Sequence, residues 1–359
     1  MRRKKRNITI LALGDKCDFD AYQKFNRVKN LFINYGFDYV TTNYKKFISG
    51  KNLKIKTDKI IIFFFFPFYY WNKYVEHRRY KGIYGNISFY DKFLRFWNLV
   101  EKRFKKYPSN KKLLFINNPR LCAAYRDKLS VFKKIAKFRI SQVRRYKKMS
   151  IKEIQNKLAS SYKFFLKPRC GSMGKGITFL SKDNWQTNFV LKGKKIISQR
   201  SDYGWKFTDV TGNFTFLKML LKKDILIQEA VENLILNGNK VDFRVYTFFK
   251  KSIYVYPRKN KIDKVTTNIS QGGQGDPRLL RLLPKGLLTK AVKAAENTAK
   301  ALNIILAGID IIPNRNCKDV YVIDVNLFTG FPKSRTFDLA KKLASRLSQL
   351  DDKGELHFK

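Results

Sequence analysis

The sequence has few acidic residues, few histidines and few cysteines. It contains 27 Asp and Glu residues against 76 Lys and Arg residues, with two histidines and four cysteines in 359 residues. Two histidines are too few for histidine-rich metal chemistry or a histidine-based triad. The cysteines are scattered and form no C-x-x-C pair, which argues against a zinc site or a disulfide framework and fits a reducing compartment. We therefore expect a cytoplasmic protein.

Long hydrophobic runs are also missing. The N-terminal MRRKKR resembles the start of a signal peptide, but only about seven apolar residues follow it before a Gly-Asp-Lys sequence. The apolar run IIIFFFF at residues 60–66 is too short to span a bilayer. Unbroken apolar runs of this length are typical of buried parallel strands. We expect strands at 7–14 and 60–66; a membrane-surface patch is the alternative for the second run.

The excess of positive charge, +49 overall, can attract polyanions. It predicts an acidic partner or acceptor, such as nucleic acid, anionic lipid, or an acidic polymer or peptide. Compositional drift in a Lys-, Asn-, Ile- and Phe-rich chain is the alternative explanation.

Strands alternate with helical stretches in the first third of the chain, which favours an α/β domain with a parallel sheet. A helix at 22–35 and a third strand at 113–117 complete this part, whereas residues 72–110 show no clear period. Further along we expect helices at 129–137, 213–222, 285–302 and 338–348. The remaining expected strands are 164–167, 177–180, 225–228, 242–249, 253–256, 307–312 and 321–325.

A glycine-rich loop, CGSMGKG at residues 170–176, lies between two expected strands. Glycines let a backbone approach phosphate groups and direct N–H groups at them. A strand on both sides excludes a Walker loop and a Rossmann turn, since both lead into a helix. Alone, the loop could be an ordinary hairpin. Lys167 strengthens the phosphate interpretation, because a lysine within an apolar strand is costly to bury unless it is paired.

Two later segments carry further polar candidates. Asp242 and Arg244 lie two residues apart in an expected strand and so share one face, where Asp242 could accept ribose hydroxyls and Arg244 could reach phosphate. An exposed cross-strand salt-bridge face is the alternative. In TTNISQGGQGDPR, residues 266–278, Asn268 and the glycines after it predict a tight loop with room for a substrate, or a plain turn.

Two acidic segments near the C-terminus are candidates for metal binding. Asp310 and Asp324 each lie in or at the end of an apolar strand, and buried carboxylates need compensation. With the amide oxygen of Asn326, they form a set of hard oxygen ligands suited to magnesium that also holds phosphates. Capped aspartates at strand ends are the alternative.

The order of these motifs resembles the ATP-grasp superfamily, in its glutathione-synthetase-like carboxylate–amine ligase branch. The resemblance covers about residues 117–335 and rests on GGQGDPR (272–278), GIDII (308–312) and D-x-N (324–326). TTNISQGG is also similar to the spore-coat-associated YheC/YheD-type proteins. The resemblance implies an α/β pre-grasp domain at 1–120, a central subdomain with the glycine loop at 121–225 and a C-terminal subdomain with the magnesium site at 226–350.

The resemblance also implies site roles, and Lys128 becomes a candidate only in this context. The nucleotide-binding set would be Lys128, Lys167, Gly171, Ser172, Met173, Gly174, Gly176, Gln228, Glu229, Ala230, Val231 and Asp242. Asp310, Asp324 and Asn326 would hold two magnesium ions, and Arg244, Arg258 and Asn268 would face the γ-phosphate and an acyl-phosphate. The implied enzyme joins a carboxylate to an amine, with ATP converted to ADP and phosphate.

Two residues depart from the glutathione synthetase pattern. Asp324 stands where glutamate is usual, and Thr266 stands where those enzymes carry a substrate-side arginine. The acceptor is therefore open, and an acidic acceptor would match the charge. Two other functions remain as alternatives: a non-catalytic nucleotide-binding surface or coat-associated protein, and a basic nucleic-acid-binding protein on a decayed ATP-grasp fold.

Overall fold

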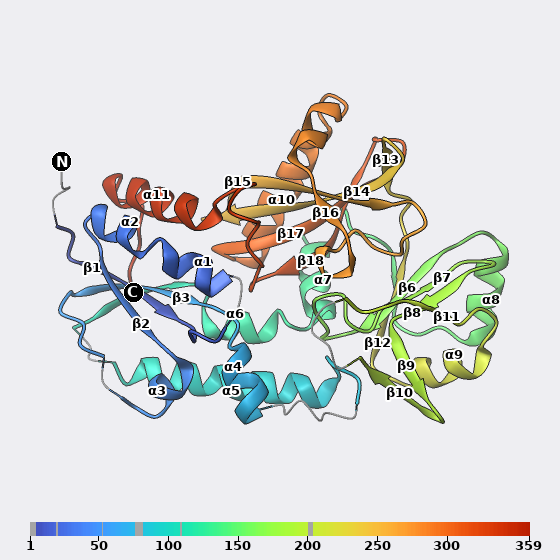
Figure 1. The fold of residues 1–359 in the computed structure, drawn as a ribbon, viewed down its shortest axis with the longest axis horizontal. Coiled ribbons are helices and arrows are strands. Elements are labelled where there is room, and N and C mark those ends of the chain that lie inside the picture. The colour runs from blue at the N-terminus through green and yellow to red at the C-terminus, as the bar shows by residue number, and fades with distance from the viewer. Residues whose placement is uncertain (1–4, 19–20, 52, 76–81, 108–109, 200–203) are drawn as a thin grey trace.

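The computed structural model describes residues 5–18, 21–51, 53–75, 82–107, 110–199 and 204–359, and the statements below refer to these residues. They form three units, each built on its own sheet (Figure 1). No helix among them is both long enough and apolar enough to cross a membrane.

The N-terminal unit is a parallel sheet, as the sequence predicts, and it contains a fourth strand, β2 (Asp38–Thr42), in addition to the three expected ones. Its strands lie in the order β2, β1 (Ile8–Leu13), β3 (Lys59–Phe64), β4 (Lys112–Ile116). All six residues of β1 are buried, because helices cover both faces of the sheet. One face packs against α1 (Ala21–Arg27), α2 (Lys29–Asn34) and α11 (Leu339–Asp352). The other packs against α3 (Tyr44–Ile48), α5 (Ile87–Lys105) and α6 (Pro119–Ala124).

Two expectations for this unit need correction. The helix expected at 22–35 is interrupted at Val28, which separates α1 from α2. Residues 72–110 do contain a periodic segment, helix α5, which Asn86 caps through its side chain. Its buried residues include Phe89, Phe93 and Phe96, whose spacing follows one helical face. Exposed apolar residues such as Ile87 and Leu99, and the half-buried Tyr90, hide the period in the sequence. Residues 76–81 and 108–109 of this segment lie outside the described part.

The short elements before α5 are α4 (Phe68–Tyr70) and a π-helical turn, η1 (Trp71–Val75). They follow β3 and place an aromatic segment next to the carboxyl end of the parallel sheet, where ligands bind in open α/β sheets.

The central unit is a six-stranded sheet with a separate core. Its strands lie in the order β11 (Thr208–Asp209), β8 (Trp185–Thr187), β7 (Thr178–Leu180), β6 (Phe164–Pro168), β12 (Ile225–Glu229), β5 (Arg145–Tyr146). Helices α8 (Ile151–Ala159) and α9 (Phe214–Leu221) pack on it, and β9 (Phe189–Lys192) pairs with β10 (Lys195–Ser198) in a neighbouring hairpin. Strands β6 and β7 are antiparallel, so the glycine loop is the turn between two strands, as predicted.

The C-terminal unit is a second six-stranded sheet, and its pairings are antiparallel. Its strands are β16 (Gln274–Gly275), β15 (Lys251–Lys261), β14 (Asn239–Phe248), β17 (Leu306–Pro313) and β18 (Val320–Asn326), with β13 (Leu234–Leu236) paired to β14. Helix α10 (Leu287–Leu302) covers one face and contacts α7 (Lys128–Ala136). Two 3-10 turns, η2 (Ile269–Gln271) and η3 (Pro277–Leu282), flank β16.

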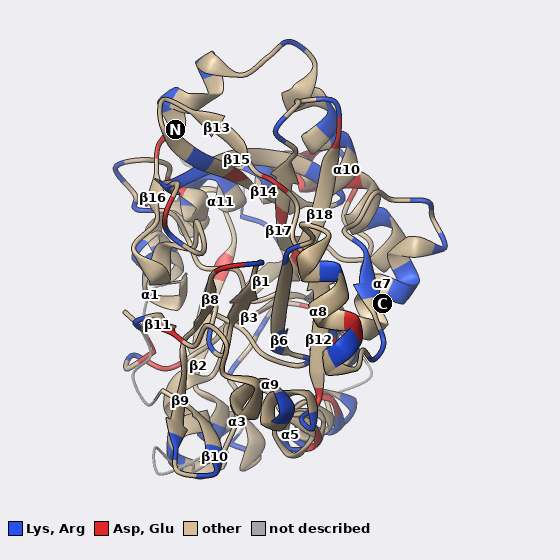
Figure 2. Ribbon diagram, turned by 90° about the vertical axis from the view of Figure 1, so that its right-hand side faces the viewer, with Lys and Arg blue, Asp and Glu red and all other residues tan. Residues whose placement is uncertain are grey.

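The N- and C-terminal units share their cores, whereas the core of the central unit is almost its own. Two clusters of buried side chains each combine residues of the parallel sheet with residues of β14 and β17. The third cluster contains residues of the central unit and Ile83. Lys and Arg residues lie on elements of all three units (Figure 2).

Candidate active site

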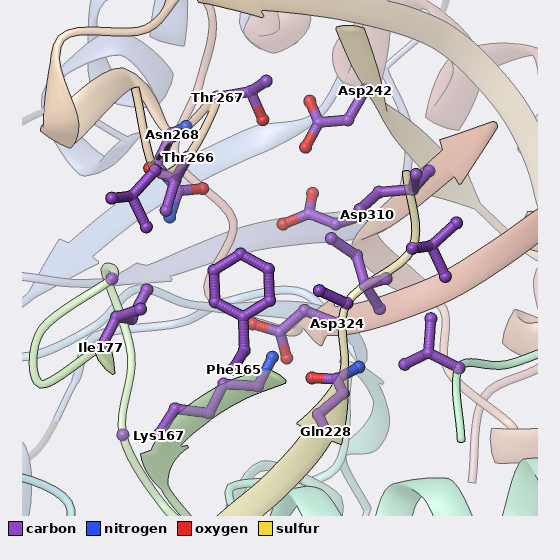
Figure 3. A pocket seen from close by; sticks show the side chains of 18 of the residues that line it. Phe165, Lys167, Ile177, Gln228, Asp242, Thr266, Thr267, Asn268, Asp310 and Asp324 are labelled. Atoms are coloured by element: carbon purple, nitrogen blue, oxygen red, sulfur yellow. Dashed lines mark hydrogen bonds between the residues drawn. The ribbon is translucent and has the colours of Figure 1, made fainter. Parts of the chain in front are cut away.

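A cavity of about 120 Å³ lies between the central and C-terminal sheets (Figure 3). Strands β6 and β12 form one side, and β14, β17, β18 and the 265–268 loop form the other. Most of the predicted nucleotide-binding residues line it, although they come from three distant parts of the chain.

Both predicted phosphate lysines line this cavity. Lys167 projects from β6 toward the aspartates (Figure 3), and burial together with nearby Lys128 lowers its pKa to about 7. Lys128, the first residue of α7, donates to Asp324 Oδ1 across a Nζ–Oδ1 distance of 2.5 Å. These two lysines therefore lie near Asp310 and Asp324 in the cavity wall, an arrangement that suits an anionic ligand with a bound cation.

The glycine loop closes one end of the cavity, and its glycines are required by its shape. Gly174 has φ +74°, and a Cβ there would lie 2.9 Å from Asn268 Nδ2. Gly176 has φ +79°, and a Cβ there would lie 2.8 Å from the Phe189 ring. A second loop holds the first in place, since Ser270 Oγ donates to the carbonyl of Met173 at 2.9 Å. Asn268, on that second loop, faces the cavity as expected.

The proposed metal ligands lie together on adjacent strands. Asp310 of β17 is directly opposite Asp324 of β18, and Asn326 Nδ2 lies 3.3 Å from Asp310 Oδ2. Asp310 is 4% exposed and accepts two hydrogen bonds from Arg244, at 2.7 and 2.8 Å. Burial alone would raise the pKa of Asp310, but Arg244 and Arg258 outweigh burial and hold it below the usual value.

The residues fit a magnesium ion by their chemistry. Magnesium is usually held by one or two carboxylates together with substrate phosphates. Asp310 and Asp324 supply the carboxylates and Asn326 an amide oxygen, and Asp324 Oδ2 has no hydrogen-bond donor among the described residues. In the described part of the chain no group of three or more His, Cys, Asp or Glu side chains could hold a metal ion. Magnesium at Asp310 and Asp324 would therefore need further ligands, which the Asn326 amide oxygen and substrate phosphates can supply.

Asp242 and Arg258 form a buried ion pair on β14 and β15. Each is 2% exposed, and the guanidinium donates to both carboxylate oxygens at 2.7 and 2.5 Å. Arg258 Nη2 also lies 3.4 Å from Asp310 Oδ1, so the pair continues into the metal-binding aspartate. The alternative of an exposed salt-bridge face is therefore wrong: the ion pairs exist, but they are buried beside the cavity.

The predicted adenine-binding segment also reaches the cavity. Gln228, Glu229, Ala230 and Val231 line it at the end of β12. The Gln228 side chain is 2% exposed and its Oε1 has no hydrogen-bond partner among the described residues. Apolar side chains complete the walls, and the sequence alone did not identify them: Val143, Phe165, Ile177, Ile312 and Ile323.

A second, larger cavity of about 440 Å³ adjoins the first. The residues that line both are Lys128, Gly171, Ser172, Gly174, Asn268, Asp310 and Asp324. Arg244, Arg258 and Asn326 line only the second. Its far wall is formed by the N-terminal unit, through residues that the sequence did not point to.

Comparisons with known proteins agree with this geometry. The ATP-grasp ligase PsnB complexed with a minimal precursor superimposes with a TM-score of 0.55 at 11% identity, over 95% of this chain and 99% of that one. The Chryseobacterium gregarium RiPP-associated ATP-grasp ligase, in complex with ADP and a leader and core peptide, gives 0.54 at 11% identity, over 95% and 96%. The D-cycloserine synthetase DcsG gives 0.52 at 13% identity, over 94% and 99%.

At these identities the structural matches establish the fold, which is that of the ATP-grasp ligases. No curated protein matches the sequence. The sequence model of the YheC/D like ATP-grasp family matches residues 122–345, which is most of the chain. The prediction of an ATP-grasp fold is thus confirmed, and the chain belongs to the YheC/D-like ATP-grasp family.

Proposed function

We propose that the protein is an ATP-dependent ligase that joins a carboxylate to an amine through an acyl-phosphate. The observation that carries this proposal is the junction between the two cavities. Lysines, the glycine loop and the paired aspartates meet there, with a slot lined by most of the predicted nucleotide-binding residues on one side and a separate chamber on the other.

In this proposal the first cavity binds ATP. The adenine lies against the segment that contains Gln228, Glu229, Ala230 and Val231, between apolar walls. Asp242 accepts a ribose hydroxyl through lone pairs that its pairing with Arg258 leaves over. Lys128 and Lys167 hold the α and β phosphates. Backbone N–H groups of residues 171–176 close over the triphosphate.

Asp310, Asp324 and Asn326 would hold magnesium, and we propose two ions. Bound magnesium would supply charge neutralisation for the phosphates. The cations that now pair with these aspartates would be released toward phosphate: Lys128 from Asp324, and Arg244 from Asp310. The positive charges of Lys128 and Arg244 are thus positioned before the negatively charged ATP binds.

The reaction then has two steps. A carboxylate oxygen of the acid substrate attacks the γ-phosphorus, the bond from that phosphorus to the β-phosphate oxygen breaks, and ADP leaves. The amine nitrogen attacks the acyl carbonyl, phosphate leaves with the electron pair of the broken C–O bond, and the amine gives up one proton. Arg244, Arg258 and Asn268 line the chamber where the acyl-phosphate would form and would stabilise its charge.

Several finer features belong to the same proposal. The three functional units would be residues 1–120, 121–225 and 226–350. The need for ATP favours the cytoplasm. One of the structurally similar proteins was solved with a leader and core peptide, which makes a peptide a reasonable amine or acid to test. The net charge of +49 favours an acidic acceptor among these.

The first test is nucleotide binding. ATP with magnesium should raise the melting temperature, since a ligand that binds only the folded state stabilises it. Lys167→Met should reduce this shift, whereas Lys194→Met, at an exposed position outside the cavity, should leave it unchanged. The absence of any shift with wild-type protein would sink the proposal.

The second test is turnover. A screen of carboxylates, with hydroxylamine as a small amine, should yield hydroxamate together with ADP and phosphate for some members. A nucleotide-binding protein without catalysis would show the thermal shift but no product with any acid. A nucleic-acid-binding protein would show an affinity for nucleic acid that falls steeply as the salt concentration rises and that does not change in Lys167→Ala.

A further inference from the structure

The second cavity has a composition that restricts what it can bind. It extends from the glycine loop and the aspartates to the carboxyl ends of strands in the N-terminal sheet. Its described lining contains two carboxylates, Asp310 and Asp324, and both face the nucleotide end. Twelve of the residues in the remainder of the wall are Phe or Tyr.

Four aromatic side chains remain partly exposed within this wall. They are Phe66, Phe68, Tyr84 and Phe328. They belong to one ring cluster with buried neighbours: the Phe66 ring centroid lies 4.6 Å from Phe68 and 5.8 Å from Phe328. Apolar rings left exposed around a chamber of this size predict a ligand with a substantial apolar part.

Arg126 is the unusual cation of this chamber. Its Nη2 donates to Ser172 Oγ at 2.7 Å and to Tyr84 Oη at 3.0 Å. Its Nε is buried without a hydrogen-bond partner, and its Nη1 makes no hydrogen bond to the described residues. The guanidinium also lies over the Phe89 and Phe93 rings, at 5.1 and 5.4 Å from their centroids.

Other cations at the junction already have acidic partners. Lys128 is paired with Asp324, Arg244 with Asp310 and Arg258 with Asp242. Among the described residues Arg126 has no carboxylate within ion-pair distance. A partly buried guanidinium with unused donors is costly unless an anion completes it, and a carboxylate matches its planar geometry.

The position of Arg126 shows which anion is suitable. Through Ser172 it contacts the tip of the glycine loop, and through Tyr84 it contacts the aromatic wall. An anion bound to Arg126 therefore lies beside the loop that would cover the triphosphate, while the group attached to that anion lies against the rings.

We infer that the acid substrate carries a bulky aromatic or apolar group, and that Arg126 binds its carboxylate and orients it toward the γ-phosphate. This inference rests on the proposed function and names the substrate class for it. A small, wholly polar acid would leave the rings of Phe66, Phe68 and Phe328 facing water. The contribution of Arg126 is to bind and position, and no proton transfer is assigned to it.

The test is binding in the presence of magnesium and a non-hydrolysable ATP analogue. The probes are 3-phenylpropionate, its uncharged amide 3-phenylpropanamide, and propionate. We expect 3-phenylpropionate to bind at least about tenfold more tightly than either, because the amide lacks the charge and propionate lacks the ring.

Two variants separate the contributions. Arg126→Gln should bring the affinity for 3-phenylpropionate down to that of the amide, and Arg126→Lys should recover part of the difference. Arg95→Gln, at an exposed arginine of α5 outside both cavities, is the matched control and should change nothing. In every variant the thermal shift with ATP and magnesium checks that the fold and the nucleotide site are intact.

The outcomes separate the two proposals. If ATP with magnesium does not raise the melting temperature of the wild-type protein, the proposed function is refuted. A normal ATP shift with equal binding of 3-phenylpropionate and propionate overturns the inference about the apolar group. Discrimination between acid and amide that survives Arg126→Gln overturns the role of Arg126.

Discussion

Lys167 should make both stability and nucleotide binding depend on pH. Burial beside Lys128 lowers its pKa from 10.5 to about 7. A pKa shift of that size means that keeping Lys167 charged in the folded protein would lower the free energy of unfolding by roughly 5 kcal/mol. Between pH 7 and 10.5 the unfolded chain binds the proton and the free folded protein does not, so the free energy of unfolding rises with pH in this window.

The Lys167→Met variant tests this without any ligand. From pH 7 to pH 9 the wild type should gain about 2 kcal/mol more stability than Lys167→Met, measured by urea unfolding at both values. Lys194→Met, at an exposed lysine, should follow the wild type.

Nucleotide binding should also change the protonation of Lys167. Phosphates next to Lys167 favour its charged form, so at pH 8 binding should take up about 0.9 proton, and well below pH 7 almost none. Calorimetry of an ATP analogue in two buffers of different ionisation enthalpy measures this uptake. An uptake near zero at pH 8, or equal pH dependence of stability in wild type and Lys167→Met, would refute the reasoning.

Three further predictions concern the ion pairs and the core. Asp324→Asn should lower the rate of ADP release at least about 100-fold while leaving the melting temperature of the free protein within a few degrees, because Asp324 and its partner Lys128 are only partly buried in the free protein, whereas the charge of Asp324 is needed to hold metal and nucleotide. Asp242→Ala should destabilise the fold by about 3–5 kcal/mol in urea unfolding, since it leaves Arg258 charged and buried; the double variant with Arg258→Met should recover much of that loss, and no recovery would argue against this cause. Leu343→Ala, at a fully buried position of α11, should cost about 2–5 kcal/mol without changing affinity for ATP in calorimetry, and a large change in affinity would show that α11 shapes the nucleotide site.

The elements that the sequence predicts best are those with strong local patterns. The unbroken apolar runs at β1 and β3 favour buried strands, and the glycine loop between two strands follows from short-range rules. Lys167, Asp310 and Asp324 stand out because each places a charge inside an apolar strand. The order of the motifs then placed them in one site.

What the sequence could not supply depends on tertiary contact. Arg126 is one arginine in a chain with 76 Lys and Arg residues, and its lack of an acidic partner appears only once the chain is folded. Helix α5 was missed because its exposed face also carries large residues, such as Leu99 at 49% exposure. The pairing of Asp242 with Arg258 joins the two strands of a hairpin, and a β-bulge between Tyr246 and Thr247 shifts their register in a way that the sequence does not reveal.

The shared core of the N- and C-terminal units has a consequence for how ligands enter. Residues of both sheets are interleaved in the same two clusters, so we expect these two units to move as one rigid body and the central unit, with its nearly separate core, to be the part that moves relative to them. The rigid body would keep Asp310, Asp324 and the aromatic rings in fixed relation, while the central unit carries Lys167 and the glycine loop. An opening motion would therefore move the glycine loop away from the phosphate site and leave the walls of the second cavity in place. Arg126, hydrogen-bonded to Ser172 of the glycine loop, lies at the boundary between the two parts.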